Sequence, residues 1–442
     1  MSKICVWIRN EFRLNDNPAL IYALHQKKSI DVIYCHHNSD HNWKLGSAAK
    51  VWLQQALLNF AKDLKSQNLV LEIKEMNPIA FFQEKDCYDE IVFNKAFEPA
   101  LVDQENKVSD ILKRKNIKSK IFNGNYLFDP ELIKNKQGQP FKVFTPFYKH
   151  CLAMFEDLID SQFKLQLKEY DSGSQVASCS QIDALNLQGV DKPWNRSWQE
   201  KMMSYWNMDS KKLIRNFCEH DARKYQEQRD FPALESGTSK ISPYLRFGQI
   251  SPFRIYHEAK KVNANEFIRQ LIWREFANYT MFHFPHSINQ DLYPNLKHIK
   301  WDNDAEMIER WQRGLTGYPI VDAGMRELWA TGWMHNRVRM IVGSFLIKDL
   351  LCHWTIGAKW FWDTLVDADL ANNTMGWQWV AGSGVDASPF FRIFNPYLQT
   401  EKFDPQMLYI KKWVPEYMTG DYPLPIVDHD FARKRALAIL KQ

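Results

Sequence analysis

WMHNRVRM at residues 333–340 opens the part of the chain that decides the fold, and DADLANN follows at residues 367–373. The same part continues with WQW at residues 377–379 and ends in FFRIFNP at residues 390–396. An apolar core has no need of paired aspartates and consecutive asparagines beside so many large aromatics. The combination indicates a cleft that holds a large, flat ligand with polar edges.

Upstream of this stretch, strand-like runs alternate with helical patterns over the first 130 residues. Asp16 or Asn17 can cap a helix that begins at Pro18, because proline suits the first helical turn. Such alternation predicts parallel β-α-β units in an α/β, doubly wound sheet, which we place at residues 1–130. The domain has no G-x-G-x-x-G fingerprint for a dinucleotide. Strands are expected at residues 3–9, 30–35, 69–73, 90–94 and 120–122, and further helices at 48–64 and 102–115.

The rest of the chain divides into a connector and a helical domain. Residues 165–200 are rich in Ser, Asp, Gln and Asn and have little periodicity, so we predict an interdomain connector at residues 131–204. From residue 205 onward the apolar pattern is helical, with few strand-like runs. We therefore expect an all-helical C-terminal domain at residues 205–442.

The totals of the chain limit its class. A length of 442 residues is too great for a single core. The net charge of +5 permits an anionic partner such as DNA without requiring one. No apolar run is long enough to span a membrane and no signal-peptide pattern opens the chain, so we expect a cytoplasmic protein. The 7 cysteines have no C-x-x-C spacing, so no metal site is predicted.

Tryptophan is the unusual total, at 17 residues, of which eleven lie between Trp273 and Trp413. For each of them alone, core packing is the first explanation, since aromatic rings supply large buried areas. Their concentration in one third of the chain also fits a ligand cleft or a role in electron transfer.

Two short motifs add polar groups that could serve such a cleft. The segment GTSKISP at residues 237–243 could bind a diphosphate through hydroxyls, backbone N–H groups and a lysine, although a helix-capping loop is the commoner use. In a helix over residues 270–276, Gln270, Trp273 and Arg274 share one face, as Asn336 and Met340 do in the next motif. Amide, indole and thioether groups facing one cavity could grip a nucleobase, although ordinary packing also explains Met340.

The order of these motifs resembles the photolyase/cryptochrome family over residues 3 to about 417. The resemblance rests on VWIRNEFRLNDN at 6–17, VFTPF at 143–147, TGYPIVDA at 316–323, TGWMHNR at 331–337 and the stretch 373–396. It implies an α/β antenna domain and a helical domain that holds FAD in a U shape. The flavin-binding positions it implies are Tyr225, Thr238, Ser239, Lys240, Ile241 and Ser242 at the phosphates and ribityl chain, with Arg274, Asn336, Arg339, Asp367, Asp369 and Asn373 elsewhere around the flavin.

The resemblance also assigns roles in catalysis. Asn373 matches the residue that faces flavin N5, where an amide can hydrogen-bond a protonated nitrogen. Plant cryptochromes carry aspartate there, so asparagine favours repair. Trp377, Trp354 and Trp301 match a chain that carries electrons from the surface to the flavin, and no metal takes part.

A second group of residues matches the family's site for damaged DNA. Trp273 and Trp379 correspond to the ring pair around a flipped pyrimidine dimer, and Asn336 and Met340 to the cyclobutane-dimer site. The branch that repairs (6-4) photoproducts needs two histidines at the last two positions. The cations that match positions near the DNA strand or the lesion are Arg229, Arg337 and Arg392.

Gln270 departs from the cyclobutane-dimer pattern, which usually has glutamate there. Its amide can still donate an N–H to a thymine carbonyl but cannot transfer a proton. The resemblance is closest to bacterial photolyases that split cyclobutane pyrimidine dimers, so we expect a light-dependent carbon–carbon lyase that repairs DNA through photoexcited reduced FAD. The alternatives are a cryptochrome-type blue-light photoreceptor, and a (6-4) photolyase, which Gln270 alone suggests.

The antenna pigment and the partners complete these expectations. The segment NKAFEP at residues 94–99 resembles the one whose glutamate binds a folate antenna, which makes Glu98 the candidate residue. The expected partner is ultraviolet-damaged DNA. We expect no membrane association and no obligate protein partner, and a monomer.

Overall fold

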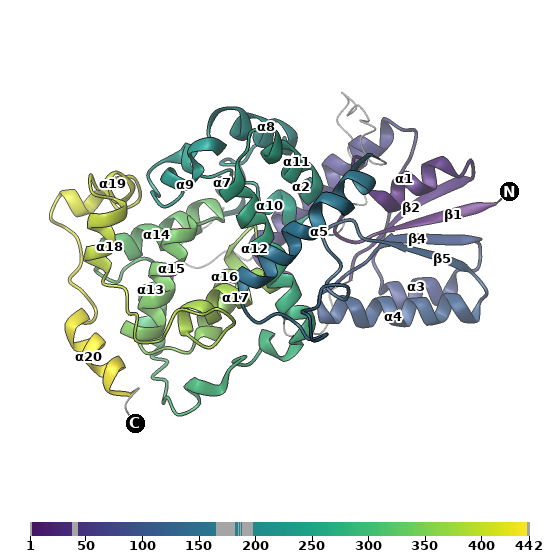
Figure 1. Ribbon diagram of the computed structural model, residues 1–442. Coiled ribbons are helices and arrows are strands. Elements are labelled where there is room, and N and C mark those ends of the chain that lie inside the picture. Colours follow the sequence, from purple (N-terminus) through teal and green to yellow (C-terminus); the bar gives the residue numbers. More distant parts are fainter. Residues whose placement is uncertain are drawn as a thin grey trace.

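A parallel five-stranded sheet, in the order β3-β2-β1-β4-β5, occupies one end of the molecule (Figure 1). It is seen in a computed structural model, which describes residues 2–37, 43–164, 182–183, 185, 187 and 198–439. β1 lies in the centre, where Val6 is level with Val32 of β2 and with Val92 of β4. The strands are β1 (Lys3–Ile8), β2 (Ser29–Cys35), β3 (Leu71–Lys74), β4 (Glu90–Asn94) and β5 (Lys118–Phe122).

Helices cover both faces of this sheet, so its strands are apolar on both sides. Ile4 and Val6 of β1 face the core formed with α1 and α2, while Cys5 and Trp7 face the core formed with α3 and α4. The expected doubly wound α/β domain is confirmed. The predicted third strand began two residues early, and exposed Val70 lies before it. The covering helices are α1 (Pro18–His25), α2 (Ser47–Lys65), α3 (Pro78–Glu84) and α4 (Pro99–Arg114).

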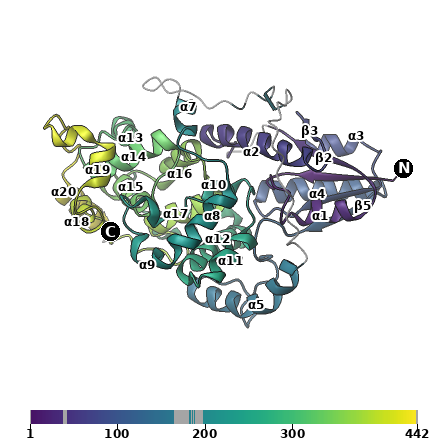
Figure 2. The ribbon, with the colours of Figure 1, turned by 90° about the horizontal axis from the view of Figure 1, so that it is seen from above.

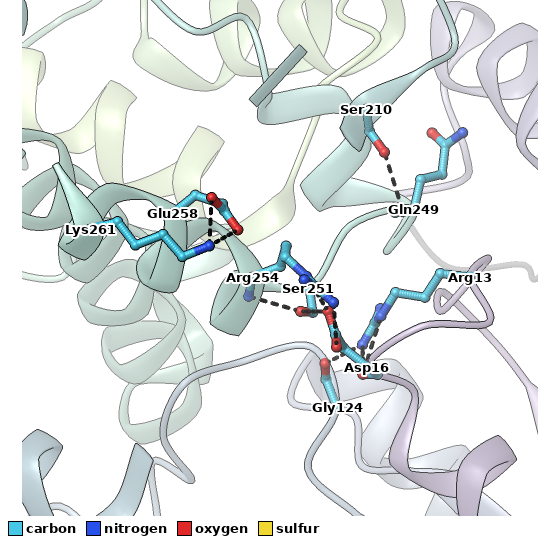
Figure 3. Close-up of polar contacts among 9 residues, drawn as sticks. All are labelled: Arg13, Asp16, Gly124, Ser210, Gln249, Ser251, Arg254, Glu258 and Lys261. Atoms are coloured by element: carbon cyan, nitrogen blue, oxygen red, sulfur yellow. Dashed lines mark hydrogen bonds and ion pairs between the residues drawn. The ribbon is translucent and has the colours of Figure 1, made fainter. Parts of the chain in front are cut away.

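The polar turn before α1 joins the two halves of the molecule (Figure 3). Of the two predicted caps, Asn17 performs the role, since its side chain accepts a hydrogen bond from the N–H of Leu20. Asp16 points instead to the helical half, where its carboxylate accepts from the Ser251 hydroxyl at 3.0 Å and pairs with Arg254 at 3.2 Å. Asp16 is buried, so this pair is desolvated and depends on its partners.

The second half of the described chain is helical, as expected, and ends at the pole opposite the sheet (Figure 1). Short 3-10 turns link many of its helices, and one π-helical turn, η5 (Phe345–Asp349), extends α15. The helices are α7 (Trp198–Met203), α8 (Ser210–His220), α9 (Tyr225–Gln228), α10 (Ser242–Arg246), α11 (Pro252–Lys261), α12 (Asn265–His283), α13 (Ala305–Gln312), α14 (Pro319–Thr331), α15 (Asn336–Ser344), α16 (Trp354–Thr364), α17 (Leu370–Ala381), α18 (Pro396–Phe403), α19 (Leu408–Trp413) and α20 (His429–Ile439).

The region predicted as a connector, residues 131–204, contains a long helix, α5 (Phe144–Lys164). The start of α5 lies beside α12 (Figure 2), with Phe147 against Phe276 and Tyr279. Most of the Ser- and Gln-rich tract at residues 165–200 lies outside the described residues. Among the residues that are described, no helix is long and apolar enough to cross a membrane.

One glycine lies where the two halves approach most closely. Gly248 has φ +56°, and a Cβ there would lie 2.0 Å from the carbonyl oxygen of Asn10. The carbonyl of Gly248 accepts a hydrogen bond from Arg13 Nη1 at 2.8 Å. The residue therefore combines a left-handed backbone with a contact that leaves no room for a side chain.

We expect Gly248→Ala to destabilise the protein by about 2–5 kcal/mol, because the methyl group adds a backbone clash to an unfavourable φ. Gly138→Ala is the matched control, since Gly138 has φ +75° and a Cβ there would meet nothing within 4 Å among the described residues. The control should lose only about 1–2 kcal/mol. Urea midpoints measure both variants, and equal losses would contradict the close approach at Gly248.

Candidate functional site

A cavity of about 570 Å³ opens in the helical half. Its volume lies in the usual range for ligand sites. α12, α15 and α17 contribute side chains to it, together with the segment 238–246 and the stretch 365–369. Most of the residues singled out from the sequence line this one space: Tyr225, Arg229, Thr238, Ser239, Lys240, Ile241, Ser242, Gln270, Trp273, Arg274, Asn336, Arg339, Met340, Asp367, Asp369, Asn373, Trp377 and Trp379.

An ion pair in the cavity wall joins Arg339 to Asp367. Arg339 Nη2 lies 2.8 Å and 3.1 Å from the two carboxylate oxygens of Asp367. The Ser242 hydroxyl donates to the same carboxylate at 2.7 Å, and Arg339 Nε donates to the carbonyl of Met334 at 2.7 Å. These contacts fix three side chains from three separate segments, so the wall is organised before any ligand binds.

Asp369 has a different task from Asp367. It caps α17, since its Oδ1 accepts from the N–H of Asn372 at 2.9 Å and from the Asn372 side chain at 2.7 Å. The two carboxylates therefore have separate hydrogen-bond partners. Among the described residues, no group of three His, Cys, Asp or Glu side chains could hold a metal.

The amide of Asn373 has a fixed orientation. Its Nδ2 donates to the carbonyl oxygen of Ala358 in α16 at 2.9 Å. The Oδ1 atom is thereby left as the group that can meet a ligand, and it is an acceptor. A ring N–H, such as that of a protonated flavin N5, is the complementary donor.

The residues around the cavity fit FAD. Gly376 lines the cavity, and a Cβ there would meet nothing within 4 Å among the described residues, so this wall leaves room for a flat ring. The segment at residues 238–242 offers hydroxyls and the Lys240 ammonium, groups suited to phosphates. Lys240 itself has φ +49°, a strained conformation typical of functional loops. The apolar, hydroxyl and cationic parts of the wall match the ring, the ribityl chain and the diphosphate.

The proposed lesion side of the cavity combines rings with amides. Trp273 stacks one face on Phe144 of α5, with ring centroids 3.6 Å apart and planes 9° apart, so its orientation is fixed. Within the described part of the chain, the side-chain amides of Gln270 and Asn336 make no hydrogen bond. Both amides are thus available to a ligand that offers carbonyl and N–H groups.

His335 does not supply the histidine of a (6-4) site. It caps α15, where its Nδ1 accepts from the N–H of Arg337, and it lines a separate small space rather than the large cavity. Burial lowers the pKa of His335 to about 4, so the imidazole is neutral. The sequence analysis missed Glu327. Its carboxylate accepts hydrogen bonds from the backbone N–H of His335 and from the Tyr409 hydroxyl, and so holds the start of α15 in place.

The three tryptophans of the expected electron route lie in one region. The Trp377 indole lies on α16 so closely that a Cβ on Gly357 would be 2.0 Å from its Cη2. Trp354 begins α16, one turn before Gly357, and is fully buried. Half-buried Trp301 reaches Trp354 through the His353 ring, with centroid distances of 5.3 Å and 5.8 Å. The rings lead from the cavity wall toward the surface.

Two of the predicted DNA-contacting cations lie outside the cavity lining. Arg337 pairs with Asp230 at 2.8 Å and lies over the Phe403 ring. Arg392 is exposed on the loop after α17, and its carbonyl accepts from Lys348 Nζ at 2.8 Å. Lys348 belongs to the π-helical turn and is 1% exposed, so a buried ammonium holds the loop that carries Arg392.

Arg274 and Glu98 lie toward the sheet. Arg274 lines the cavity, but its Nη1 donates to the Asn125 carbonyl and pairs with Glu275, each at 3.0 Å. Glu98 pairs with Arg246 at 3.7 Å beside a space of about 30 Å³. A space of this size holds no more than a few water molecules. A folate at Glu98 stays a prediction, and it would require this space to widen.

Comparisons with known proteins cover nearly the whole chain. Residues 4–166 match the family model described as DNA photolyase, and residues 267–420 match the FAD binding domain of DNA photolyase. The deoxyribodipyrimidine photo-lyase of Agrobacterium fabrum is 35% identical, with 99% of this chain and 97% of the relative aligned. Cryptochrome-2 of Arabidopsis thaliana is 34% identical, with 94% and 71% aligned.

A solved structure shows the same architecture. The crystal structure of a bacterial class III photolyase from Agrobacterium tumefaciens superposes with a TM-score of 0.87 at 34% identity, covering 100% of this chain and 97% of the other. The expected two-part fold and FAD as the cofactor are thereby confirmed. The roles of the individual site residues stay predictions.

We expect Asn373→Asp to weaken the protonated forms of the flavin. The substitution removes the Nδ2 donor to Ala358 and puts a carboxylate oxygen against that carbonyl, which repels it. The side chain then turns away from Ala358, and flavin N5–H loses its oriented acceptor. Loss of one hydrogen bond corresponds to about a tenfold change, so air should reoxidise the reduced flavin about ten times faster. The control is Asn77→Asp at the cap of α3, where an acceptor is retained. Equal reoxidation rates in both variants would exclude a role for Asn373 at the flavin.

We expect the buried ammonium of Lys348 to make stability depend on pH. Burial lowers the pKa of Lys348 to about 7, opposed by Asp349 and assisted by Arg392. Above pH 7 the unfolded chain binds more protons than the folded protein, so the free energy of unfolding rises with pH. The free energy of unfolding of the wild type, relative to that of Lys348→Met, should therefore rise between pH 7 and about pH 10, by at most about 1.4 kcal/mol per pH unit.

Urea unfolding between pH 6 and pH 9.5, at intervals of about half a unit, measures this difference. Lys359→Met, at an exposed position of α16, is the control and should run parallel to the wild type at every pH. A Lys348→Met curve that also runs parallel would show that the folded protein holds Lys348 with an ordinary pKa.

Proposed function

This chain belongs to the DNA photolyase and cryptochrome family, and we propose that it repairs cyclobutane pyrimidine dimers in DNA with light. The observation that carries the proposal is the single cavity of about 570 Å³. Residues suited to a flavin and residues suited to a flipped dimer line the same space. Electron transfer from one to the other then needs no bridging cofactor.

The protein supplies position and electrostatics, while bound FAD supplies the photoexcited electron that opens the dimer ring and receives it back. Arg339, Asp367 and Ser242 hold the wall of the flavin site through their mutual contacts. The Asn373 amide presents an acceptor of fixed orientation. These groups favour a reduced, protonated cofactor, which is the electron donor in repair.

On the lesion side, Trp273 and Trp379 provide faces on which a flipped dimer can stack. A dimer stacks and pairs poorly in DNA, so extruding it costs less than extruding normal bases, which favours damaged sites. Asn336 and Gln270 offer amides to the thymine edges, and Met340 adds an adaptable apolar contact. Arg229 in the cavity wall and Arg392 on its loop would contact phosphates, so DNA binding should weaken with salt.

The lesion type follows from the same lining. The two positions at which a (6-4) site needs histidines hold Asn336 and Met340, and His335 lies outside the cavity. Gln270 is the one feature of the lining that favours the (6-4) alternative. We therefore assign the cyclobutane dimer, repaired with an amide in place of the usual carboxyl group.

A blue-light photoreceptor is the second candidate. The observation that favours it is the similarity to a plant cryptochrome at 34% identity, close to the 35% identity to the bacterial photolyase. The flavin cavity and the tryptophan route would serve either function. Asn373 and the open lesion side of the cavity support repair.

As further parts of the proposal, the protein acts as a cytoplasmic monomer with no obligate protein partner, and a second antenna chromophore binds near Glu98.

We expect the reduced protein to restore thymines in an oligonucleotide with a cyclobutane dimer under blue light, and to leave one with a (6-4) photoproduct unrepaired. Gln270→Glu should raise the yield of repair, because a carboxyl group can both donate and transfer a proton. Chromatography of the illuminated and dark samples measures the product.

Two outcomes would contradict this assignment. Repair of the (6-4) photoproduct alone would show that Gln270 outweighs Asn336 and Met340. Repair of neither lesion, by protein with bound and photoreducible FAD, would favour the photoreceptor.

A further inference from the structure

A carboxylate lies against the middle ring of the expected electron route. The indole N–H of Trp354 donates to Asp291 Oδ1 at 2.8 Å. Trp354 is 0% exposed and belongs to the core around α14, α15 and α16, so its N–H has no access to water. Asp291 lies in the segment between η3 (Pro285–Ile288) and η4 (Pro294–Leu296).

The surroundings of the other two rings of the route differ. Trp377 Nε1 is buried and has no hydrogen-bond partner among the described residues. Trp301 is half-buried near the surface and makes a T-shaped contact with the His353 ring, and no acid is hydrogen-bonded to its indole among the described residues. A negative charge therefore touches the route at its middle member.

The position of Asp291 is fixed by the helix that carries the inner ring. Gln378 lies between Trp377 and Trp379 on α17 and is buried. Its Nε2 donates a hydrogen bond to the backbone carbonyl of Gln290, and its Oε1 accepts one from the backbone N–H of Leu292, each at 2.9 Å. The residues on both sides of Asp291 are thus tied to α17, so the carboxylate is held in a defined place.

We propose that Asp291 is the charge partner and proton acceptor of Trp354 during photoreduction of the cofactor. The inference rests on the proposed electron route. Trp377 gives one electron to the photoexcited, oxidised flavin and regains one from Trp354, which becomes a radical cation. The Nε1 proton of Trp354 then passes to Asp291 Oδ1, which leaves a neutral indole radical and a neutral carboxyl group. When Trp301 returns an electron to Trp354, the proton returns to Nε1, so Asp291 is regenerated.

The direction of transfer follows from the charges. A carboxylate hydrogen-bonded to a buried indole stabilises positive charge there far more than at an indole without a partner. The positive charge is therefore drawn from Trp377 to Trp354, away from the flavin. Moving it one ring outward slows its recombination with the electron on the cofactor.

His353 is the next titratable group along the route. Burial lowers the pKa of His353, and the nearby Asp291 carboxylate opposes that effect. Its Nδ1 accepts a hydrogen bond from the N–H of Thr355 at 3.3 Å. A neutral imidazole between Trp354 and Trp301 carries no positive charge of its own. It therefore does not repel the positive charge that moves from Trp354 to Trp301.

The test compares Asp291→Asn with the wild type by transient absorption after a flash on the oxidised, FAD-loaded protein. Asparagine keeps an acceptor oxygen but has no charge and is a poor base. The neutral radical of Trp354 should be replaced by a short-lived cation, and the yield of lasting photoreduction should fall about tenfold, the factor expected for losing charge assistance in one hydrogen bond. Asp291→Glu, which retains a carboxylate, should restore part of the yield.

Asp302→Asn is the matched control, because Asp302 is next to Trp301 and its side chain is 61% exposed. It should behave as the wild type. A second readout does not need the cofactor: the indole ¹⁵N–H resonance of Trp354, identified by its loss in Trp354→Phe, should move in Asp291→Asn and stay in place in Asp302→Asn.

Trp354→Phe tests the electron route separately from the role of Asp291. If Trp354→Phe photoreduces as the wild type does, the proposed electron route is wrong and the role of Asp291 fails with it. If Trp354→Phe blocks photoreduction while Asp291→Asn matches the wild type in radical type and yield, the route stands and the role of Asp291 is excluded.

Discussion

The contact between the Trp377 indole and the backbone of α16 at Gly357 constrains the whole site. A Cβ at this position would overlap the indole, so only glycine lets α16 and α17 approach so closely. The approach places one aromatic ring both in the cavity wall and against the helix that starts with Trp354. The same helix pair brings Asn373 within hydrogen-bond distance of Ala358. A single packing contact thus sets the cofactor side of α17 and the route to the surface together.

Hydrogen bonds and ion pairs with neighbouring protein groups hold the polar side chains of the cavity in place. Asp367 is fixed by Arg339 and Ser242, and Asp369 is occupied in capping α17. Gln378 ties α17 to the segment around Asp291, and the Lys348 ammonium ties the loop of Arg392 to the π-helical turn. Buried polar groups with complete sets of partners are rigid, and rigid donors and acceptors bind a polar ligand without a cost of reorganisation. Polar groups without a hydrogen-bond partner among the described residues, such as the Gln270 amide, remain available to bind the ligand.

Much of this arrangement could be predicted from the sequence, because local patterns determine it. The alternation of β-α-β units predicted the sheet, and the motifs around Asn336 and Asn373 identified residues that now line one cavity. The sequence could not separate Asp16 from Asn17 as a cap, because the choice depends on Arg254, which lies far along the chain. It also missed α5 within the predicted connector, Asp291 and Lys348. The roles of Asp291 and Lys348 depend on contacts across 63 and 44 residues, which periodicity does not contain.

The central claim is that one cavity brings an excited flavin to a flipped dimer. The most direct measurement is the fluorescence lifetime of the bound, fully reduced flavin, taken with an oligonucleotide that carries a cyclobutane dimer and with the same sequence undamaged. Electron transfer within the cavity predicts a lifetime that shortens with the dimer and is unchanged with the undamaged strand. An unchanged lifetime at saturating dimer, with binding shown independently, would contradict the claim.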